Sequence, residues 1–280
     1  ARAEAQAEEE PLAKPPEDTI DSLLAAGDSQ RASGNVSGAL WSYIKAHDKD
    51  REDPRPLIQI ASLHLHEEPE RAFGIFSELV DADENAPGPR TGLGLVHVAL
   101  GEYGKAEAAF RRALAAEQDY PAAHNALGLV LAQRGENEEA RIHFLRAADL
   151  QPRSYVPLNN LGVLHLAQKD NALAVEVLRR AALMENRDPA VFNNLGVALG
   201  RLDRFDEALA TFRKGGPEHV ALNNLAFVQR ERGLIFDAID SYEKALLAAP
   251  PDERLEILRN LDLATQERAL RYPSPPAAAD

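Results

Sequence analysis

The sequence contains no cysteine in its 280 residues. Disulfides, cysteine-based zinc sites and thiol catalysis are therefore excluded, and the redox compartment stays undetermined. It also lacks an uninterrupted run of 18 apolar residues, so no segment is predicted to span a membrane. Basic residues are the minority, because 31 Lys and Arg stand against 45 Asp and Glu, for a net charge of −14. This balance argues against a nucleic-acid binder, which needs clustered Lys and Arg to neutralise phosphates.

Signatures of catalysis and of cofactor binding are missing as well. The sequence has no H-E-x-x-H, no G-x-x-x-x-G-K-[ST], no G-x-S-x-G and no EF-hand loop. His64 and His66 are two residues apart and would face different ways on a helix, which is a poor spacing for a shared metal ion. We therefore predict a protein that is not an enzyme and that needs no cofactor or metal.

A pattern of about 34 residues recurs through most of the chain. Its clearest copy covers residues 121–154, where Leu127-Gly128 is followed by Ala140 and Phe144. The small residues let two antiparallel helices approach closely, and the large ones fill the seam between them. This pattern resembles the tetratricopeptide repeat, a helix–turn–helix unit. One unit cannot bury its apolar face alone, so the resemblance implies a stack of neighbours.

Seven such units and a capping helix account for residues 20–271. The predicted fold is an all-α right-handed superhelix. In the last helix, Asp262 takes the position of the small residue, and an unpaired carboxylate would be costly there if a further helix packed on it. This helix is therefore expected to cap the stack with a polar outer face. The sixth unit is shorter than its neighbours, which indicates either a kink or, as we favour, a deletion tolerated in a turn. The expected boundaries are 20–52, 53–86, 87–120, 121–154, 155–188, 189–218 and 219–252, followed by the cap at 253–271.

The two ends of the chain differ in composition from the array. Residues 1–19 are acidic and contain three prolines, and they cannot bury enough surface to offset the entropy of ordering. They are predicted to form a disordered tether, or simply a frayed terminus. Residues 272–280 are rich in Pro and Ala and are predicted to be a disordered tail.

Asparagine recurs in register on the first helices of the later units. Helical propensity does not explain this, because Asn is a mediocre helix former. In tetratricopeptide proteins positions two, five, six, nine, twelve and thirteen of each unit line a concave surface, so the resemblance implies a ladder of amides along a groove. The asparagines at positions five and six are Asn125, Asn159, Asn160, Asn193, Asn194, Asn223 and Asn224.

Each carboxamide offers two donors and an acceptor with two lone pairs. A row of them can bond a peptide backbone without reading its side chains. This ladder resembles the one in the tetratricopeptide domain of the O-linked N-acetylglucosamine transferase, although no transferase domain is present. The alternative is that each Asn bonds the adjacent helix and stabilises the stack. The two roles are compatible, and we favour peptide binding.

Other groove positions define the expected ligand. Arg201 and Arg230, at positions thirteen and twelve, are candidates to pair with an acidic ligand group, or they are ordinary solvated surface. Position nine is apolar, which favours an amphipathic helix or an extended apolar segment as ligand and argues against the carboxylate-clamp subtype, which carries Asn there. The position-nine residues are Leu95, Leu129, Val163, Val197 and Phe227.

Two kinds of residue are expected to pack rather than to bind. His97 and His165 take the position that favours Tyr in this family, and His124 takes the Trp position. We expect them at the edge of the core with their hydrogen bonds satisfied. Trp41, the single Trp, is expected to pack as well.

The resemblance implies a non-enzymatic scaffold that binds a partner peptide or helix. The acidic first segment, the lack of Cys and the Asn-Asn-Leu-Gly units resemble bacterial tetratricopeptide lipoproteins. Those of tight-adherence (Flp) and type IV pilus assembly act as pilotins or assembly factors for an outer-membrane secretin. This implies a periplasmic location at the inner face of the outer membrane, with an acylated Cys before Ala1. The alternatives are a cytoplasmic adaptor or secretion chaperone, and a regulatory domain of a larger enzyme.

Overall fold

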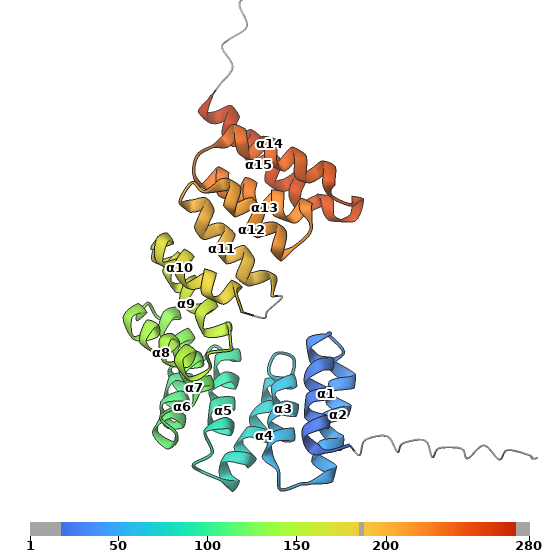
Figure 1. Cartoon of the computed structure of the whole chain (residues 1–280). Helices are drawn as coiled ribbons and strands as arrows, with labels where there is room; N and C mark the ends of the chain where they lie inside the picture. The colour runs from blue at the N-terminus through green and yellow to red at the C-terminus, as the bar shows by residue number, and fades with distance from the viewer. Residues whose placement is uncertain (1–17, 185–187, 273–280) are drawn as a thin grey trace, which may run out of the picture. The chain divides into compact units, whose positions relative to one another are not determined.

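The computed structural model describes residues 18–184 and 188–272, and within them all regular structure is helical (Figure 1). The predictions for residues 1–17 and 273–280 lie outside this part. Helices α1 to α14 form seven consecutive pairs, and α15 follows them, so the predicted all-α array with a C-terminal helix is confirmed. The helices are α1 (Ile20–Ala32), α2 (Val36–Lys49), α3 (Pro54–His64), α4 (Pro69–Ala82), α5 (Pro87–Ala99), α6 (Tyr103–Ala116), α7 (Pro121–Gln133), α8 (Asn137–Leu150), α9 (Val156–Ala167), α10 (Asn171–Ala182), α11 (Pro189–Arg201), α12 (Phe205–Gly215), α13 (Glu218–Glu231), α14 (Ile235–Ala248), the short 3-10 helix η1 (Pro251–Glu253) and α15 (Arg254–Arg271).

Several first helices begin where the sequence supplies a cap. The carboxylate of Asp53 accepts a hydrogen bond from the backbone N–H of Arg55 at 2.9 Å. Asp188 does the same for the N–H of Ala190, also at 2.9 Å. Each of these caps precedes a proline at the first helical position, where the missing N–H costs little.

The turn inside the helix pair has a repeating backbone conformation. The fifteenth residue of six units is left-handed, a region that glycine enters without strain. Four units supply glycine there, whereas two use a residue with a side chain. These residues are Gly34, Gly101, Gly135, Lys169, Asp203 and Gly233, with φ values of 80°, 74°, 79°, 65°, 60° and 80°.

In several of the helix pairs, a large side chain of the second helix packs against a small residue of the first helix. A Cβ atom added to Gly128 would lie 2.7 Å from Cε1 of Phe144, and one added to Gly94 would lie 2.3 Å from Cε1 of Phe110. Both phenylalanines are fully buried. The predicted packing of small residues against large ones is therefore confirmed.

The sixth pair is short in its second helix as well as in its connection. Helix α12 has 11 residues, whereas α8 and α14 have 14 each. Gly216 and Pro217 alone join it to α13. A Cβ atom on Gly200 would lie 2.6 Å from Cγ1 of Val228, so the first helices α11 and α13 also approach closely here. The missing residues therefore come partly from a helix, and a deletion confined to the turn is not what the structure shows.

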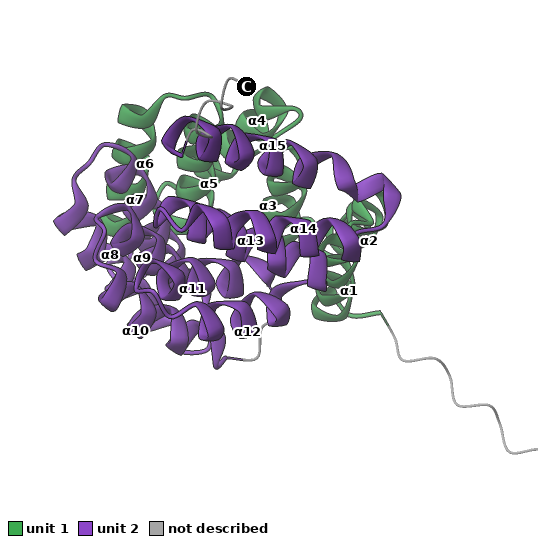
Figure 2. Ribbon diagram, turned by 90° about the horizontal axis from the view of Figure 1, so that it is seen from above, with its two compact units in different colours: residues 1–116 green, residues 117–280 purple. Residues whose placement is uncertain are grey.

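The chain divides into two compact units, residues 1–116 and 117–280 (Figure 2). Within the first unit, Tyr43, Phe76 and Phe110 are the largest fully buried side chains, and Trp41 is 59% exposed with Nζ of Lys45 4.1 Å from its ring centroid. The expectation that Trp41 packs into the core is therefore wrong.

The second unit holds α7 to α15 and all of the predicted site residues except Leu95, which lies on α5 in the first unit. Apolar side chains fill the seams between its helices, with Phe144, Leu178, Phe212 and Tyr242 among the most buried. Asp262 on α15 is exposed and accepts a hydrogen bond from Nε2 of Gln266 at 2.7 Å, as expected for a capping helix. Within the described residues, no helix combines the length and the apolar character that crossing a bilayer requires.

Candidate functional site

Side-chain amides join the first helices of the second unit to one another. In each contact the asparagine at position six of one helix donates to the asparagine at position five of the preceding first helix. We call the eight residues involved the amide ladder. Its bonds run from Asn160 to Asn125 (2.9 Å), Asn194 to Asn159 (2.9 Å), Asn224 to Asn193 (3.2 Å) and Asn260 to Asn223 (3.1 Å).

The asparagines therefore bond the adjacent first helix, which is the alternative to peptide binding that the sequence left open. Each ladder bond uses one donor of one carboxamide and one lone pair of the other. A carboxamide has two donors and two acceptor lone pairs, so most of its bonding capacity remains. All eight side chains are half-buried. The ladder therefore holds the helices together, and its capacity to bind a peptide stays a prediction.

The ladder begins and ends inside the second unit. Helix α7 has Ala126 at position six, so it supplies only the acceptor Asn125. Helix α15 has Arg259 at position five and supplies only the donor Asn260. Asn260 was not among the site residues predicted from the sequence. The signal was the step Asn260-Leu261, which repeats the Asn-Leu step of the earlier units.

An apolar row runs beside the ladder on the same helices. Leu129, Val163 and Phe227 stand one helical turn after position five and are 47%, 44% and 43% exposed. Val197 belongs to the same row, but it is half-buried and packs against the core. Exposed side chains of this size at the equivalent place on α7, α9 and α13 form a surface that a partner can cover.

Position two of these helices, on the other side of the ladder, is also apolar. Its residues in α7, α9, α11 and α13 are Ala122, Val156, Ala190 and Val220. Positions two, five, six and nine of these four helices therefore carry no charged residue, although 27% of the chain is charged. We call this surface the uncharged face. Its sixteen residues are Ala122, Asn125, Ala126, Leu129, Val156, Asn159, Asn160, Val163, Ala190, Asn193, Asn194, Val197, Val220, Asn223, Asn224 and Phe227.

The two arginines predicted at the site are already paired within the unit. Nε and Nη2 of Arg201 each lie 3.1 Å from a carboxylate oxygen of Glu231, and Nη1 lies 3.3 Å from the carbonyl oxygen of Leu166. Nε of Arg230 lies 3.7 Å from Oε2 of Glu267. A ligand carboxylate would have to displace an intramolecular partner, so these arginines join consecutive first helices.

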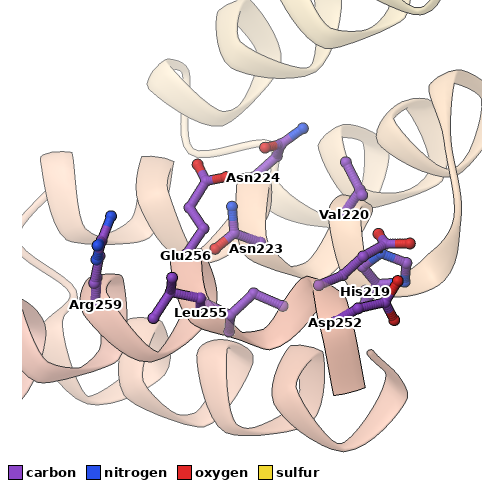
Figure 3. Close-up of a pocket in the computed structure, with 10 residues that line it drawn as sticks. His219, Val220, Asn223, Asn224, Asp252, Leu255, Glu256 and Arg259 are labelled. Carbon is purple, nitrogen blue, oxygen red and sulfur yellow. The ribbon is translucent and has the colours of Figure 1, made fainter. Parts of the chain in front are cut away.

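A cavity of about 630 Å³ opens where the ladder ends, between α13, η1 and α15 (Figure 3). Asn223 and Asn224 belong both to the ladder and to its wall, so the cavity continues the uncharged face. Buried His219 lines the cavity, with Nε2 2.6 Å from Oε2 of Glu253. The sequence did not predict this site. The lining residues are His219, Val220, Asn223, Asn224, Asp252, Glu253, Leu255, Glu256, Ile257 and Arg259.

The histidines expected to pack behave in two ways. His124 is buried and fully used, because its Nδ1 lies 2.8 Å from Nδ1 of His143 and its Nε2 lies 2.9 Å from the carbonyl oxygen of Gln118. His165 is also buried, but its Nδ1 has no hydrogen-bond partner among the described residues. Burial lowers the pKa of His165. Nδ1 of half-buried His97 lies 2.7 Å from Oε2 of Glu102.

Metal chemistry has no obvious place in the described residues. They bring together no group of three or more His, Asp or Glu side chains arranged to hold an ion. The uncharged face offers amides and apolar side chains, which are suited to binding.

Comparison with known proteins gives the fold a name. Residues 91–155 and 159–216 match the family model of the tetratricopeptide repeat. The helix pairs are tetratricopeptide repeats in fold. The match runs from α5 through α12, apart from residues 156–158, and includes five of the eight ladder residues. No curated protein sequence matches the chain.

Solved structures resemble the chain at low sequence identity, so the likeness concerns the fold. A chain of the APC/C hetero-tetramer Cut9–Hcn1 has a TM-score of 0.68 and 19% identity, over 89% of this chain and 50% of that one. The present chain thus spans about half its length. PilF of Pseudomonas aeruginosa has a TM-score of 0.62 and 21% identity, over 78% of this chain and 97% of PilF. YrrB is described as a tetratricopeptide protein with an unusual peptide-binding site. It has a TM-score of 0.54 and 19% identity, over 69% of this chain and 97% of YrrB.

Proposed function

We propose that the chain is a non-enzymatic interaction scaffold whose second unit holds a segment of a partner protein against the uncharged face. The observation that carries this proposal is the apolar row, because Leu129, Val163 and Phe227 leave nearly half of each side chain in water at the equivalent place in three of four neighbouring repeats. Covering them releases water from apolar surface, which is the main favourable term in protein association. The peptide-binding site of YrrB, which shares the fold, adds support.

The ladder contributes to binding in a secondary way. Its amides flank the apolar row and keep donors and acceptors after bonding one another, so they can bond the backbone of a segment lying on the row. Because they also join the helices, replacing them would disturb the stack and the binding surface together. The apolar row is therefore the better place to test function.

A triple variant of the apolar row provides that test. A library of random 12-residue peptides is selected on the full chain, and the enriched peptides are titrated against Leu129→Ser/Val163→Ser/Phe227→Ser. We expect these peptides to lose about tenfold or more in affinity, which corresponds to about 1.4 kcal/mol. Circular dichroism and urea unfolding report on the fold of the variant.

The matched control changes three exposed apolar residues on second helices of the same unit. Ile142, Leu173 and Leu247 are 58%, 47% and 84% exposed, and their replacement by Ser alters surface apolarity to a similar degree. Peptide affinity should survive in this control. Equal binding by the wild type and the apolar-row variant would remove the proposed function, as would a selection that enriches no peptide.

The specific form of this proposal is an assembly factor or pilotin for a bacterial pilus or for a secretion secretin. Its support is the resemblance of the sequence to such lipoproteins, together with the shared fold of PilF. It would act from the periplasm, at the inner face of the outer membrane. The codons upstream of Ala1 test it: a signal sequence ending in a lipobox Cys supports it. A plain start Met favours the cytoplasmic adaptor or chaperone instead, and an adjoining catalytic domain favours the regulatory role.

A further inference from the structure

The cavity beside Asn223 and Asn224 lies directly at the end of the uncharged face. We propose that it takes a basic side chain of the bound segment, so that the preferred ligand is an uncharged run with a Lys or Arg at one end. This inference rests on the proposed function of the same surface and adds the chemical class of the ligand.

The charge of the cavity wall is the first argument. Asp252, Glu253 and Glu256 contribute three carboxylates against the one guanidinium of Arg259. Oε2 of Glu253 is held by His219 at 2.6 Å. In Figure 3, Asp252 lies with His219 on one side of the lining and Arg259 lies on the other, with Glu256 between them. The side of the cavity around Asp252 and Glu256 is therefore complementary to a cation.

The contrast with neighbouring carboxylates is the second argument. Glu231 on α13 is paired with Arg201, and Glu267 on α15 is paired with Arg271 at 2.6 Å. Among the described residues, Asp252 and Glu256 have no ion pair of this kind. Two carboxylates without an ion pair of this kind thus lie where the uncharged face ends in a cavity.

The remaining wall suits the rest of a Lys or Arg side chain. Leu255 is 61% exposed and Val220 is half-buried, so both can contact the aliphatic stem of the ligand side chain. Asn224 uses its amide N–H to bond Asn193, which leaves its oxygen as an acceptor for an ammonium or guanidinium. The cavity thus offers carboxylates for the charged end of the side chain and apolar contacts for its stem.

The peptide library selected on the full chain tests this inference with a second variant. Asp252→Asn/Glu256→Gln removes both unpaired charges while keeping the shape of the side chains. Peptides selected on the wild type should carry Lys or Arg at a fixed position beside an uncharged run. Selection on the double variant should keep the run and lose the preference for the basic residue.

Affinity measurements make the test quantitative. Replacing the basic residue of a selected peptide by Gln should weaken its binding to the wild type about five- to tenfold, and added salt should reduce the difference. On the double variant the same replacement should have little effect. The control Asp237→Asn/Glu243→Gln makes the same change of charge on α14, and it should behave as the wild type does.

The outcomes separate the two levels of the proposal. If the basic preference is missing on the wild type or persists on Asp252→Asn/Glu256→Gln, while binding still depends on Leu129, Val163 and Phe227, the cavity assignment is overturned and the docking face stands. Binding that responds to neither set of substitutions overturns both.

Discussion

Nδ2 of Asn194 lies 2.9 Å from Oδ1 of Asn159 and joins α11 to α9 through their side chains. The two residues are 35 positions apart in sequence, one repeat plus one residue. The same relationship recurs at Asn160 and Asn125, so it belongs to the repeat and not to one helix pair. Repeat proteins gain stability from interfaces between neighbours, and the ladder adds a polar contribution to each such interface.

A double-mutant cycle should detect this contribution. Asn159→Ala and Asn194→Ala should each lower the free energy of unfolding by about 1 kcal/mol, the ordinary net value of a hydrogen bond. Because they remove the same bond, the double variant should lose about 0.5–1 kcal/mol less than the sum. Urea unfolding followed by circular dichroism gives these values.

The control cycle pairs Asn159 with Asn224, which belong to different ladder bonds. Its coupling energy should be close to zero. A coupling of similar size in both cycles would show that the amides act through the overall stack and not through the bonds between them.

Two tyrosines in equivalent places predict opposite effects of losing a hydroxyl. Both are fully buried on second helices, but the hydroxyl of Tyr43 donates to Oδ1 of Asp28 at 2.7 Å, whereas that of Tyr242 has no partner among the described residues. Burial and the bond to Asp28 raise the pKa of Tyr43 to about 12. Tyr43→Phe should cost about 1 kcal/mol, and Tyr242→Phe should be neutral or stabilising, because an unpaired buried hydroxyl is itself unfavourable.

Thermal and urea unfolding of the two single variants measure this difference. Each variant serves as the control for the other, since both remove one oxygen from a buried ring. Equal losses of stability in the two would mean that the hydroxyl of Tyr242 is satisfied after all.

The sequence predicted the helix pairs because their packing follows from residue size at fixed spacing. Gly128 and Phe144 are recognisable as a small residue and a large one 16 positions apart, and the structure places them in contact. The left-handed turn is less visible, since Lys169 and Asp203 adopt it without being glycine. Residue size and spacing thus predict the helix pairs, whereas the left-handed backbone of the turn is seen only in the structure.

The site was predicted only in part. Register on the helices placed the asparagines on one face, but whether Asn194 bonds Asn159 or a ligand depends on the distance between stacked helices, which no single repeat encodes. The cavity was missed because Asp252 lies in η1, a short helix at the junction of the seventh unit and the cap that the repeat pattern does not predict. Arg201 looked free because its partner Glu231 belongs to the next repeat.

Adding a methyl group at the tight helix contact should have a large effect. A Cβ atom on Gly196 would lie 2.3 Å from Cε1 of Phe212, which is buried and cannot easily move. Gly196→Ala should therefore destabilise the second unit by about 1–3 kcal/mol. Gly74 is the matched control, because it lies inside α4 with nothing within 4 Å of an added Cβ. Gly74→Ala should stabilise its helix by about 0.5–1 kcal/mol.

Urea unfolding of both glycine variants gives the sign of each change. A neutral Gly196→Ala would indicate that α11 and α12 can separate without loss, which contradicts the close packing.

The buried imidazole of His165 predicts how stability depends on pH. Burial lowers its pKa in the folded chain, whereas the unfolded chain titrates it at about 6.5. Below that pH the imidazole of His165 becomes protonated in the unfolded chain but stays neutral in the folded chain. The stability due to neutral His165 is therefore complete above about pH 6.5 and is lost as the pH falls toward the folded pKa. His165→Phe removes this titration, so it should lose less stability than the wild type between about pH 7.5 and about pH 5.5 in urea unfolding. Parallel losses in the two proteins would show that the imidazole is protonated as readily in the fold as in the unfolded chain.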